Sequence, residues 1–173
     1  MANNGINLRD HGLAVTGQPD AGRLREWAGA GVKTVINLRH AGEFADGSAD
    51  DAGLDIAEEG RQVEALGMDY VHLPVSMKPA EEGGADGRLA TAFETLLTAA
   101  REEGPVAVHC KLGQRAGAMV LIALGRHQRW SGPRALAEAG RLGLGEVAAS
   151  DKLAAYVEAC LTPGGGSGSP SSG

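Results

Sequence analysis

Short apolar segments separated by helix-like stretches constrain the fold of this chain most strongly. The segments are rich in β-branched residues and bounded by glycine or charged residues, a pattern typical of buried strands. The stretches between them repeat apolar residues at the spacing of an amphipathic helix. Strands that alternate with helices predict a mostly parallel sheet with helices on both faces, a three-layer α/β fold. The predicted strands are residues 13–17, 32–38, 70–75 and 106–108, and the predicted helices between them are residues 20–30, 50–66 and 88–101.

The predicted helix over residues 50–66 has an inner face that we assign to Leu54, Ala57, Val63 and Leu66. In the helix over residues 88–101 the apolar spacing is stronger, and the Gly-Pro pair at 104–105 ends it. The inner face assigned to this second helix is Leu89, Phe93, Leu96, Leu97 and Ala100.

The length of 173 residues fits a single domain that buries about two-thirds of its unfolded surface. Towards the C-terminus, Ser131 is a candidate N-cap, and residues 146–161 predict a last helix. Residues 162–173, rich in Gly, Ser and Pro, contain no apolar side chain to bury. We therefore predict a domain over residues 1–161 and a disordered tail over residues 162–173.

A cysteine and an arginine stand at the two ends of a short loop after the strand at 106–108. Cys110 follows the strand, Gly113 gives the loop a flexible turn, and Arg115 begins the predicted helix. Backbone N–H groups of such a loop, together with the helix N-terminus, form an anion-binding concavity. The same field favours a cysteine thiolate, which is the nucleophilic form, and the arginine fork matches two oxygens of a phosphate-like group. We therefore predict that Cys110 is a nucleophile and that Arg115 holds an oxyanion against it, whereas Cys160 is expected to be a small buried apolar residue.

The neighbours of this pair receive supporting roles. The anion would be bound by Lys111, Leu112, Gly113, Gln114 and Arg115, with Gln114 able to orient a water molecule. His109 either orients the loop and its thiolate or is simply packed in the core. Arg39, at the end of the strand at 32–38, either lines the site or pairs with Glu43, and we prefer the pairing.

Composition excludes several other classes. A net charge of −6 and an aromatic content of 3% do not favour nucleic acid or an acidic membrane surface as a partner. Two cysteines far apart in sequence predict neither a disulfide framework nor a zinc site, and we expect no cofactor and no metal.

The first residues lack the basic and apolar regions of a signal peptide, and the longest apolar stretch is too short to span a bilayer. These two features predict a cytoplasmic protein. The sequence leaves the oligomeric state and the identity of the substrate open.

Residues 109–115 resemble the active loop of the protein tyrosine and dual-specificity phosphatase superfamily, His-Cys-x-x-Gly-x-x-Arg-Ser/Thr. Here Arg115 follows Cys110 with four residues between them instead of five, and Ala116 stands in place of the hydroxyl residue. This spacing is similar to that of the bacterial phosphatase-like domain of beta-lactamase-hydrolase-like proteins, Cys-x-Ser-Gly-x-Arg. Upstream, residues 15–19, residues 31–39 with the following Glu43, and residues 70–75 also resemble that domain, so that the resemblance extends from about Leu13 to Leu144.

The resemblance implies a cysteine-dependent phosphatase that hydrolyses phosphomonoesters through a cysteinyl-phosphate. The phosphorylated substrate would be attacked by Cys110 and held by Arg115. A carboxylic acid should protonate the leaving oxygen, but Met77 stands where the family's dual-specificity members carry their aspartate. We assign this role to Asp86, with Glu81 and Glu82 as alternatives in the same glycine-rich stretch, although the cluster also fits a solvated acidic loop.

Two alternative functions remain, because the loop between Cys110 and Arg115 is one residue shorter than in those phosphatases and no aspartate stands at the expected position. A rhodanese-like sulfurtransferase would carry a persulfide on Cys110 and would need no aspartic acid. A catalytically weak module that binds a phosphorylated ligand would use Arg115 without turnover.

Overall fold

The computed structural model describes residues 12–44, 54–76 and 87–162, and its centre is a sheet of four parallel strands. In the order β1-β4-β2-β3, these are β1 Leu13–Thr16, β4 Val106–His109, β2 Thr34–Asn37 and β3 Asp69–His72. All three pairings are parallel. The α/β fold with a parallel sheet, predicted from the alternation of strands and helices, is therefore confirmed.

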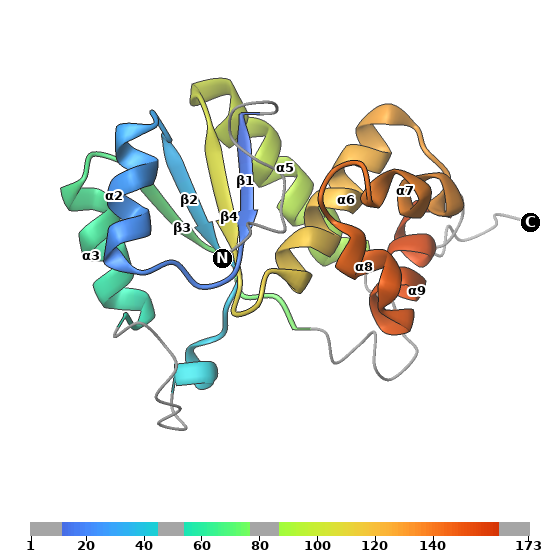
Figure 1. Ribbon diagram of the computed structural model, residues 1–173, viewed down its shortest axis with the longest axis horizontal. Helices are drawn as coiled ribbons and strands as arrows, with labels where there is room; N and C mark the ends of the chain where they lie inside the picture. Colours follow the sequence, from blue (N-terminus) through green and yellow to red (C-terminus); the bar gives the residue numbers. More distant parts are fainter. Residues whose placement is uncertain (1–11, 45–53, 77–86, 163–173) are drawn as a thin grey trace, which may run out of the picture.

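Helices cover both faces of the sheet (Figure 1). One face is covered by α2 Ala21–Gly29 and α3 Ile56–Ala65, and the other by α5 Gly87–Glu103 and α6 Gln114–Gln128. A further group of helices, α7 Gly132–Ala139, α8 Gly145–Ala149 and α9 Asp151–Leu161, packs against α6 on the side away from the sheet. The short 3-10 helix η1 Ala41–Phe44 follows β2.

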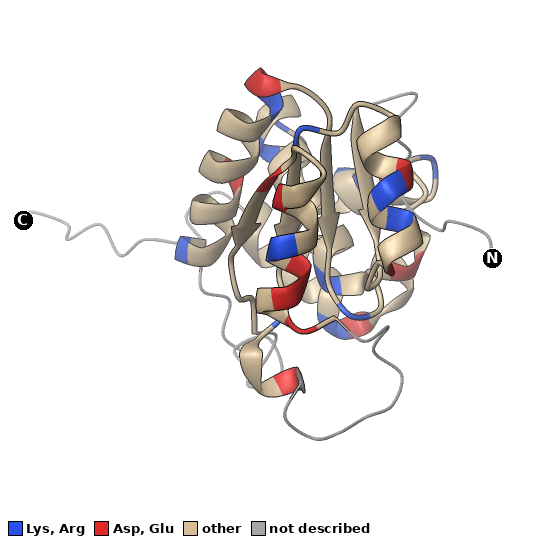
Figure 2. Cartoon of the chain, turned by 90° about the vertical axis from the view of Figure 1, so that its left-hand side faces the viewer, with Lys and Arg blue, Asp and Glu red and all other residues tan. Residues whose placement is uncertain are grey.

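Each face of the sheet has its own apolar cluster. Side chains such as Val35 and Val63 pack between the sheet and α2 and α3, whereas Phe93, Val108 and Leu121 belong to the larger cluster under α5 and α6. Burial of one such side chain contributes roughly 1.5–3 kcal/mol, so the two clusters together hold the helices on the sheet. Figure 2 shows charges of both signs distributed over the side that α2 and α3 form.

Two of the predicted helices differ from those in the structure. The segment expected as one helix over residues 146–161 is divided at Ser150, whose hydroxyl accepts a hydrogen bond from the N–H of Leu153 and caps α9. The helix predicted over residues 50–66 begins at Ile56, after Asp55 as its N-cap, and ends at Ala65. The inner face assigned to it was also partly wrong, because Ala57 and Leu66 are exposed. The prediction that Ser131 caps a helix is confirmed by a hydrogen bond from the N–H of Arg134 at 3.2 Å.

The register of the sheet places the last residues of all four strands in one row. Thr16 and Asn37 both pair with His109, and Asn37 also pairs with His72. The loops that leave these strands therefore begin at the same edge of the sheet, and ligands of open parallel sheets bind at this carboxyl edge. Cys110 is the first residue beyond this row on β4, which lies between β1 and β2.

Candidate active site

The loop between β4 and α6 holds the sulfur of Cys110 against a backbone donor. The N–H of Gly113 donates to Cys110 Sγ at 3.1 Å, and only 1% of Cys110 is exposed. Gly113 has φ +91°, in the left-handed region that disfavours side chains, and α6 begins at the next residue. The sulfur therefore faces a backbone donor beside the N-terminus of α6. No disulfide joins Cys110 to Cys160.

The loop is braced from the neighbouring strand. The N–H of Gln18 donates to the carbonyl of Lys111 at 3.0 Å, and the N–H of Cys110 donates to the carbonyl of Thr16 at 3.4 Å. These bonds tie the loop to the segment that leaves β1. Leu112, the next residue of the loop, is 72% exposed.

Arg115 in the first turn of α6 is anchored on two other elements. Its Nη1 donates to the carbonyl of Val75 at 3.1 Å, beyond the end of β3. Nη1 and Nη2 also donate to Glu43 Oε2 and Oε1, at 3.1 and 2.5 Å. Burial alone would lower the pKa of Arg115, but the hydrogen bond and charge of Glu43 and the charge of Cys110 raise it, so the guanidinium stays charged.

Glu43 is thus the partner that sets the direction of the Arg115 guanidinium. Its Oε2 also accepts from the N–H of His40 at 2.6 Å. Burial would raise the pKa of Glu43, but the Arg115 hydrogen bond, the His40 N–H and the charges of Arg115 and Arg39 outweigh it and lower that pKa. The expected pairing with Arg39 is present at a longer distance of 3.9 Å, whereas the closer pairing with Arg115 was not anticipated.

Replacing Glu43 with glutamine is expected to lower kcat/KM for a phosphate ester by about ten- to a hundredfold, because Arg115 loses the charged partner that orients it. The pKa of Glu43 lies below its ordinary value of 4.5 in the folded protein. Its stabilising effect is therefore fully present above that value and disappears as the pH falls through the lowered pKa. Thermal unfolding should separate the variant from the unmodified protein at neutral pH, and the separation should shrink in strong acid.

Glu94→Gln is the control for this change, because Glu94 forms a similarly half-buried pair with Arg126, which lies in the last turn of α6. It should leave kcat/KM unaltered. Equal kcat/KM in Glu43→Gln and the unmodified protein would contradict the orienting role of Glu43.

Arg39 is fully buried beside the loop. Its Nη1 donates to Gln18 Oε1 at 2.9 Å, and its N–H donates to Asn37 Oδ1 at 2.9 Å. The carbonyl of Arg39 lies 2.5 Å from His72 Nε2. Arg39 therefore connects the segment after β2 to Gln18, whose backbone N–H holds the loop.

A glutamate that the sequence analysis did not single out also lies behind the loop. Only 1% of Glu59 on α3 is exposed, and its Oε2 lies 2.8 Å from Nε2 of the fully buried His109. α3 can come this close because Gly60 faces the ring of Tyr70, where a Cβ would lie 2.9 Å from Cδ1. In the sequence, the four-residue spacing between Glu59 and Val63 indicates that the two residues share a face of the helix, and in α3 this face is buried.

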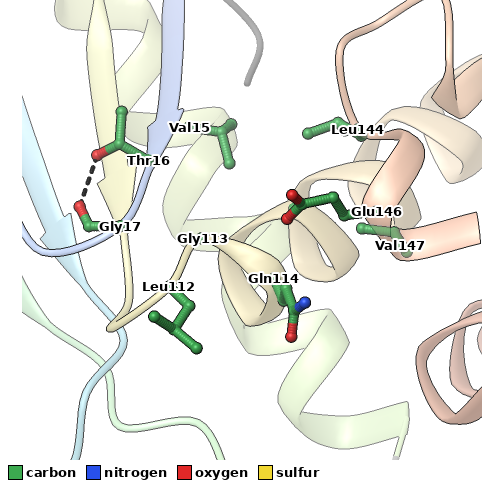
Figure 3. Close-up of a pocket in the computed structure, with 10 residues that line it drawn as sticks. Val15, Thr16, Gly17, Leu112, Gly113, Gln114, Leu144, Glu146 and Val147 are labelled. Carbon is green, nitrogen blue, oxygen red and sulfur yellow. Dashed lines mark hydrogen bonds between the residues drawn. The ribbon is translucent and has the colours of Figure 1, made fainter. Parts of the chain in front are cut away.

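A cavity of about 180 Å³ adjoins the loop on the side of α8 (Figure 3). Leu112, Gly113 and Gln114 form one wall, and Leu144 and Val147 face them from the other side. The carboxylate of Glu146 points into the space between these walls, and Glu146 is the charged side chain among the described residues that line the cavity. Lys111 and Leu112 also border a wider groove towards α2.

The remaining predicted residues were distributed as follows. Asp86, Glu81 and Glu82 lie outside the described residues, so the assignment of a general acid stays a prediction. Gln114 is exposed at the start of α6, and Ala116 is buried in the first turn of that helix. Within residues 12–44, 54–76 and 87–162, no group of three or more His, Cys, Asp or Glu side chains is placed to hold a metal ion. Among the same residues, no helix is both long and apolar enough to cross a membrane.

The parallel sheet and the cysteine–arginine loop at the end of its β4 strand define the cysteine phosphatase-like class of α/β proteins. A family model described as "Beta-lactamase hydrolase-like protein, phosphatase-like domain" matches residues 7–128. The chain belongs to this family, as its loop spacing and upstream segments predicted.

Two curated relatives show how far the similarity extends. The chain is 33% identical over 112 residues to a beta-lactamase hydrolase-like protein of Xylella fastidiosa and 35% identical over 113 residues to one of Agrobacterium fabrum. Each match covers 65% of this chain but only 22% and 23% of the relatives. The chain therefore spans less than a quarter of the length of the curated relatives it matches.

Solved structures support the fold. TpbA of P. aeruginosa has a TM-score of 0.62 and 24% identity, with 84% of this chain and 78% of TpbA covered. Tk-PTP has a TM-score of 0.63 and 18% identity, with 93% of this chain and 98% of Tk-PTP covered. A cysteine-to-serine variant of TpbA has been crystallised in complex with pTyr. These likenesses establish the phosphatase-like architecture of the chain.

Proposed function

We propose that this phosphatase-like domain is a cysteine-dependent phosphatase that hydrolyses phosphate monoesters through a cysteinyl-phosphate. The observation that carries the proposal is the contact of the Gly113 N–H with Cys110 Sγ, in a loop whose arginine is held by Glu43 and Val75. Cys110 attacks phosphorus, the bond to the leaving oxygen breaks, and Arg115 together with loop N–H groups stabilises the charge on the equatorial oxygens. Water then attacks the cysteinyl-phosphate, releases inorganic phosphate and regenerates the thiolate.

The proton of the first step needs a donor, and we keep Asp86 in this role. A general acid contributes about 10² to 10⁴ in rate by protonating the leaving oxygen and by activating water afterwards. Among the described residues, Glu43 and Glu146 also lie near the loop, but they are less suited to that role. Glu43 is held as an anion by Arg115, and Glu146 lies across the cavity on α8.

Part of the leaving group is proposed to lie in the cavity beside the loop. Its walls combine apolar side chains with the carboxylate of Glu146, which favours a neutral or positively charged leaving group over an acidic one. The complex of a TpbA variant with pTyr makes phosphotyrosine a suitable first candidate substrate.

One experiment separates this function from sulfur transfer and from binding without turnover. The unmodified protein, kept reduced, is assayed for phosphate release from a small aryl phosphate and from phosphotyrosine between about pH 5 and about pH 9. A second sample is treated with thiosulfate, and the intact mass is examined for one added sulfur atom.

Phosphate release with activity falling on both sides of a maximum is the expected result, and the basic limb would report the proposed acid. A persulfide on Cys110 without phosphate release would overturn the proposal in favour of a sulfurtransferase. Binding of phosphotyrosine with neither reaction would instead identify a phospho-ligand binding module.

A further inference from the structure

A buried pair of ionisable side chains lies directly behind the cysteine and has no part in the proposed reaction. Glu59 on α3 reaches Nε2 of His109 at 2.8 Å, and His109 is bonded in sequence to Cys110. Glu59 and His109 are essentially excluded from solvent, with exposed fractions of 1% and 0%. A buried carboxylate is costly unless it is paired and fully hydrogen-bonded. The protonation states of Glu59 and His109 must therefore match the hydrogen-bond partners around them.

The carboxylate of Glu59 receives donors on both oxygens. Gln18 Nε2 donates to Oε1 at 2.6 Å, and the hydroxyl of Tyr70 donates to Oε2 at 2.8 Å. Tyr70 must direct its proton to Glu59, because its oxygen already accepts from Asn37 Nδ2 at 2.8 Å. Burial would raise the pKa of Glu59, but the hydrogen bonds with His109, Tyr70 and Gln18 act in the opposite direction, and the pKa is lowered. Glu59 is therefore an anion with only donors around it.

His109 consequently has an acceptor at each ring nitrogen. Nε2 faces the Glu59 carboxylate, and Nδ1 lies 3.3 Å from the carbonyl oxygen of Cys110. A neutral imidazole carries one N–H and could satisfy only one of these acceptors, whereas an imidazolium donates to both. The doubly protonated ring is therefore the form that donates to both acceptors.

We propose that Glu59 holds His109 as an imidazolium and that this buried positive charge stabilises the thiolate of Cys110. Glu59 would be a positioning residue, since it acts through His109 and does not touch the reacting atoms. The imidazolium lies between Glu59 and the loop, so its charge is nearer to Cys110 than the compensating negative charge is, and its Nδ1–H holds the first carbonyl of the loop. The inference rests on the proposed function only in taking Cys110 as the nucleophile.

Other polar and charged groups surround this pair, and they come from the segments after β1 and β2, from β3 and from α6. The segment after β1 contributes Gln18, which links Glu59 to the guanidinium of Arg39 beyond β2. Tyr70 comes from β3, and burial, together with the nearby Glu59 charge, raises its pKa far above the usual value, so it remains a neutral donor. Arg115 lies on the α6 side of Cys110. Among these described neighbours, Glu59 carries the negative charge in direct contact with the imidazole.

The state of His109 is tested first in the unmodified protein. Nitrogen-15 NMR of the histidine side chains at neutral pH is expected to show His109 with both nitrogens protonated, and assignment is made by comparison with His109→Asn. A neutral tautomer of His109 in the unmodified protein would overturn the proposal without any question of misfolding.

The effect on the cysteine is tested with Glu59→Gln and with the matched control Glu58→Gln. Glu58 neighbours Glu59 on α3 but pairs outward with Arg61. The rate of alkylation by iodoacetamide is followed against pH, with the modified peptide containing Cys110 quantified separately from that of Cys160. At about pH 6, Glu59→Gln should react about tenfold more slowly, because less of the thiol is then present as the thiolate that attacks iodoacetamide, and should lose the imidazolium signal.

The control Glu58→Gln should match the unmodified protein in both measurements. If Glu59→Gln folds and yet retains the alkylation profile, the proposal is wrong. Because neither measurement needs turnover, this failure is distinguishable from a failure of the phosphatase assay, in which the imidazolium and the reactive thiolate would persist without phosphate release.

Discussion

Replacing Cys110 with serine is expected to abolish phosphate release, with kcat falling by at least about 10⁴-fold. The sulfur that receives the Gly113 N–H is the only atom placed by the loop to attack phosphorus in the mechanism proposed above. Serine preserves the size of the side chain, but its hydroxyl ionises far less readily than a thiol and remains a poor nucleophile without an adjacent base. The measurement is phosphate release from a small aryl phosphate under reducing conditions.

Cys160→Ser is the matched control, because Cys160 lies on α9 and not on the loop, and is partly buried against the larger apolar cluster. Its activity should equal that of the unmodified protein. Substantial phosphate release by Cys110→Ser would exclude a cysteinyl-phosphate and would require another nucleophile. Phosphotyrosine binding should survive in Cys110→Ser, since Arg115 and its partners are retained.

Replacing Arg115 with lysine is expected to lower kcat/KM by about 10³-fold although the charge is kept. The guanidinium fork bonds Glu43 through two nitrogens and Val75 through one of them, and this anchoring fixes its plane relative to Cys110. A lysine ammonium is a single point of charge and cannot bond Glu43 and grip two phosphate oxygens with the same geometry. Steady-state kinetics and the affinity for inorganic phosphate as a competitive inhibitor measure the loss.

The control for this change lies on the same helix. Arg126 near the end of α6 pairs with Glu94 and Thr91 on α5, and Arg126→Lys should change kcat/KM by less than about twofold. Near-normal kinetics in Arg115→Lys would mean that Arg115 contributes only its charge, and the proposed grip on equatorial oxygens would then be wrong.

The parallel sheet could be predicted because its strands form where short stretches of the sequence favour them. β-branched runs such as Val35–Ile36 and glycine-bounded segments occur where strands form, and parallel pairing follows from the helices between them. Phe93 and Leu97 were correctly assigned to the inner face of α5 by their spacing. The same reasoning failed for Ala57 and Leu66 on α3, because the buried face of that helix turns towards Tyr70 and His109 and takes up a carboxylate instead.

The sequence did not predict which distant residues pair with the candidate site residues. Glu43 was expected to pair with its near neighbour Arg39, whereas its bidentate partner Arg115 is 72 residues away. Glu59 resembles an ordinary surface glutamate of an amphipathic helix, and 50 residues separate it from His109. Spacing within a helix predicts which residues share a face, but it does not predict which distant group that face will meet.

The amino-acid sequence alone specified the alternation of strands and helices, the loop with Cys110 and Arg115 at its ends, and the family to which the chain belongs. These features are encoded within short windows, where periodicity, glycine placement and residue spacing act directly on the backbone. Only the tertiary structure brought Glu43 to Arg115 and Glu59 to His109. Those contacts depend on the strand order β1-β4-β2-β3, which brings the carboxyl ends of separate strands together at one edge, and a buried charge can be accommodated only where that assembly supplies its partner.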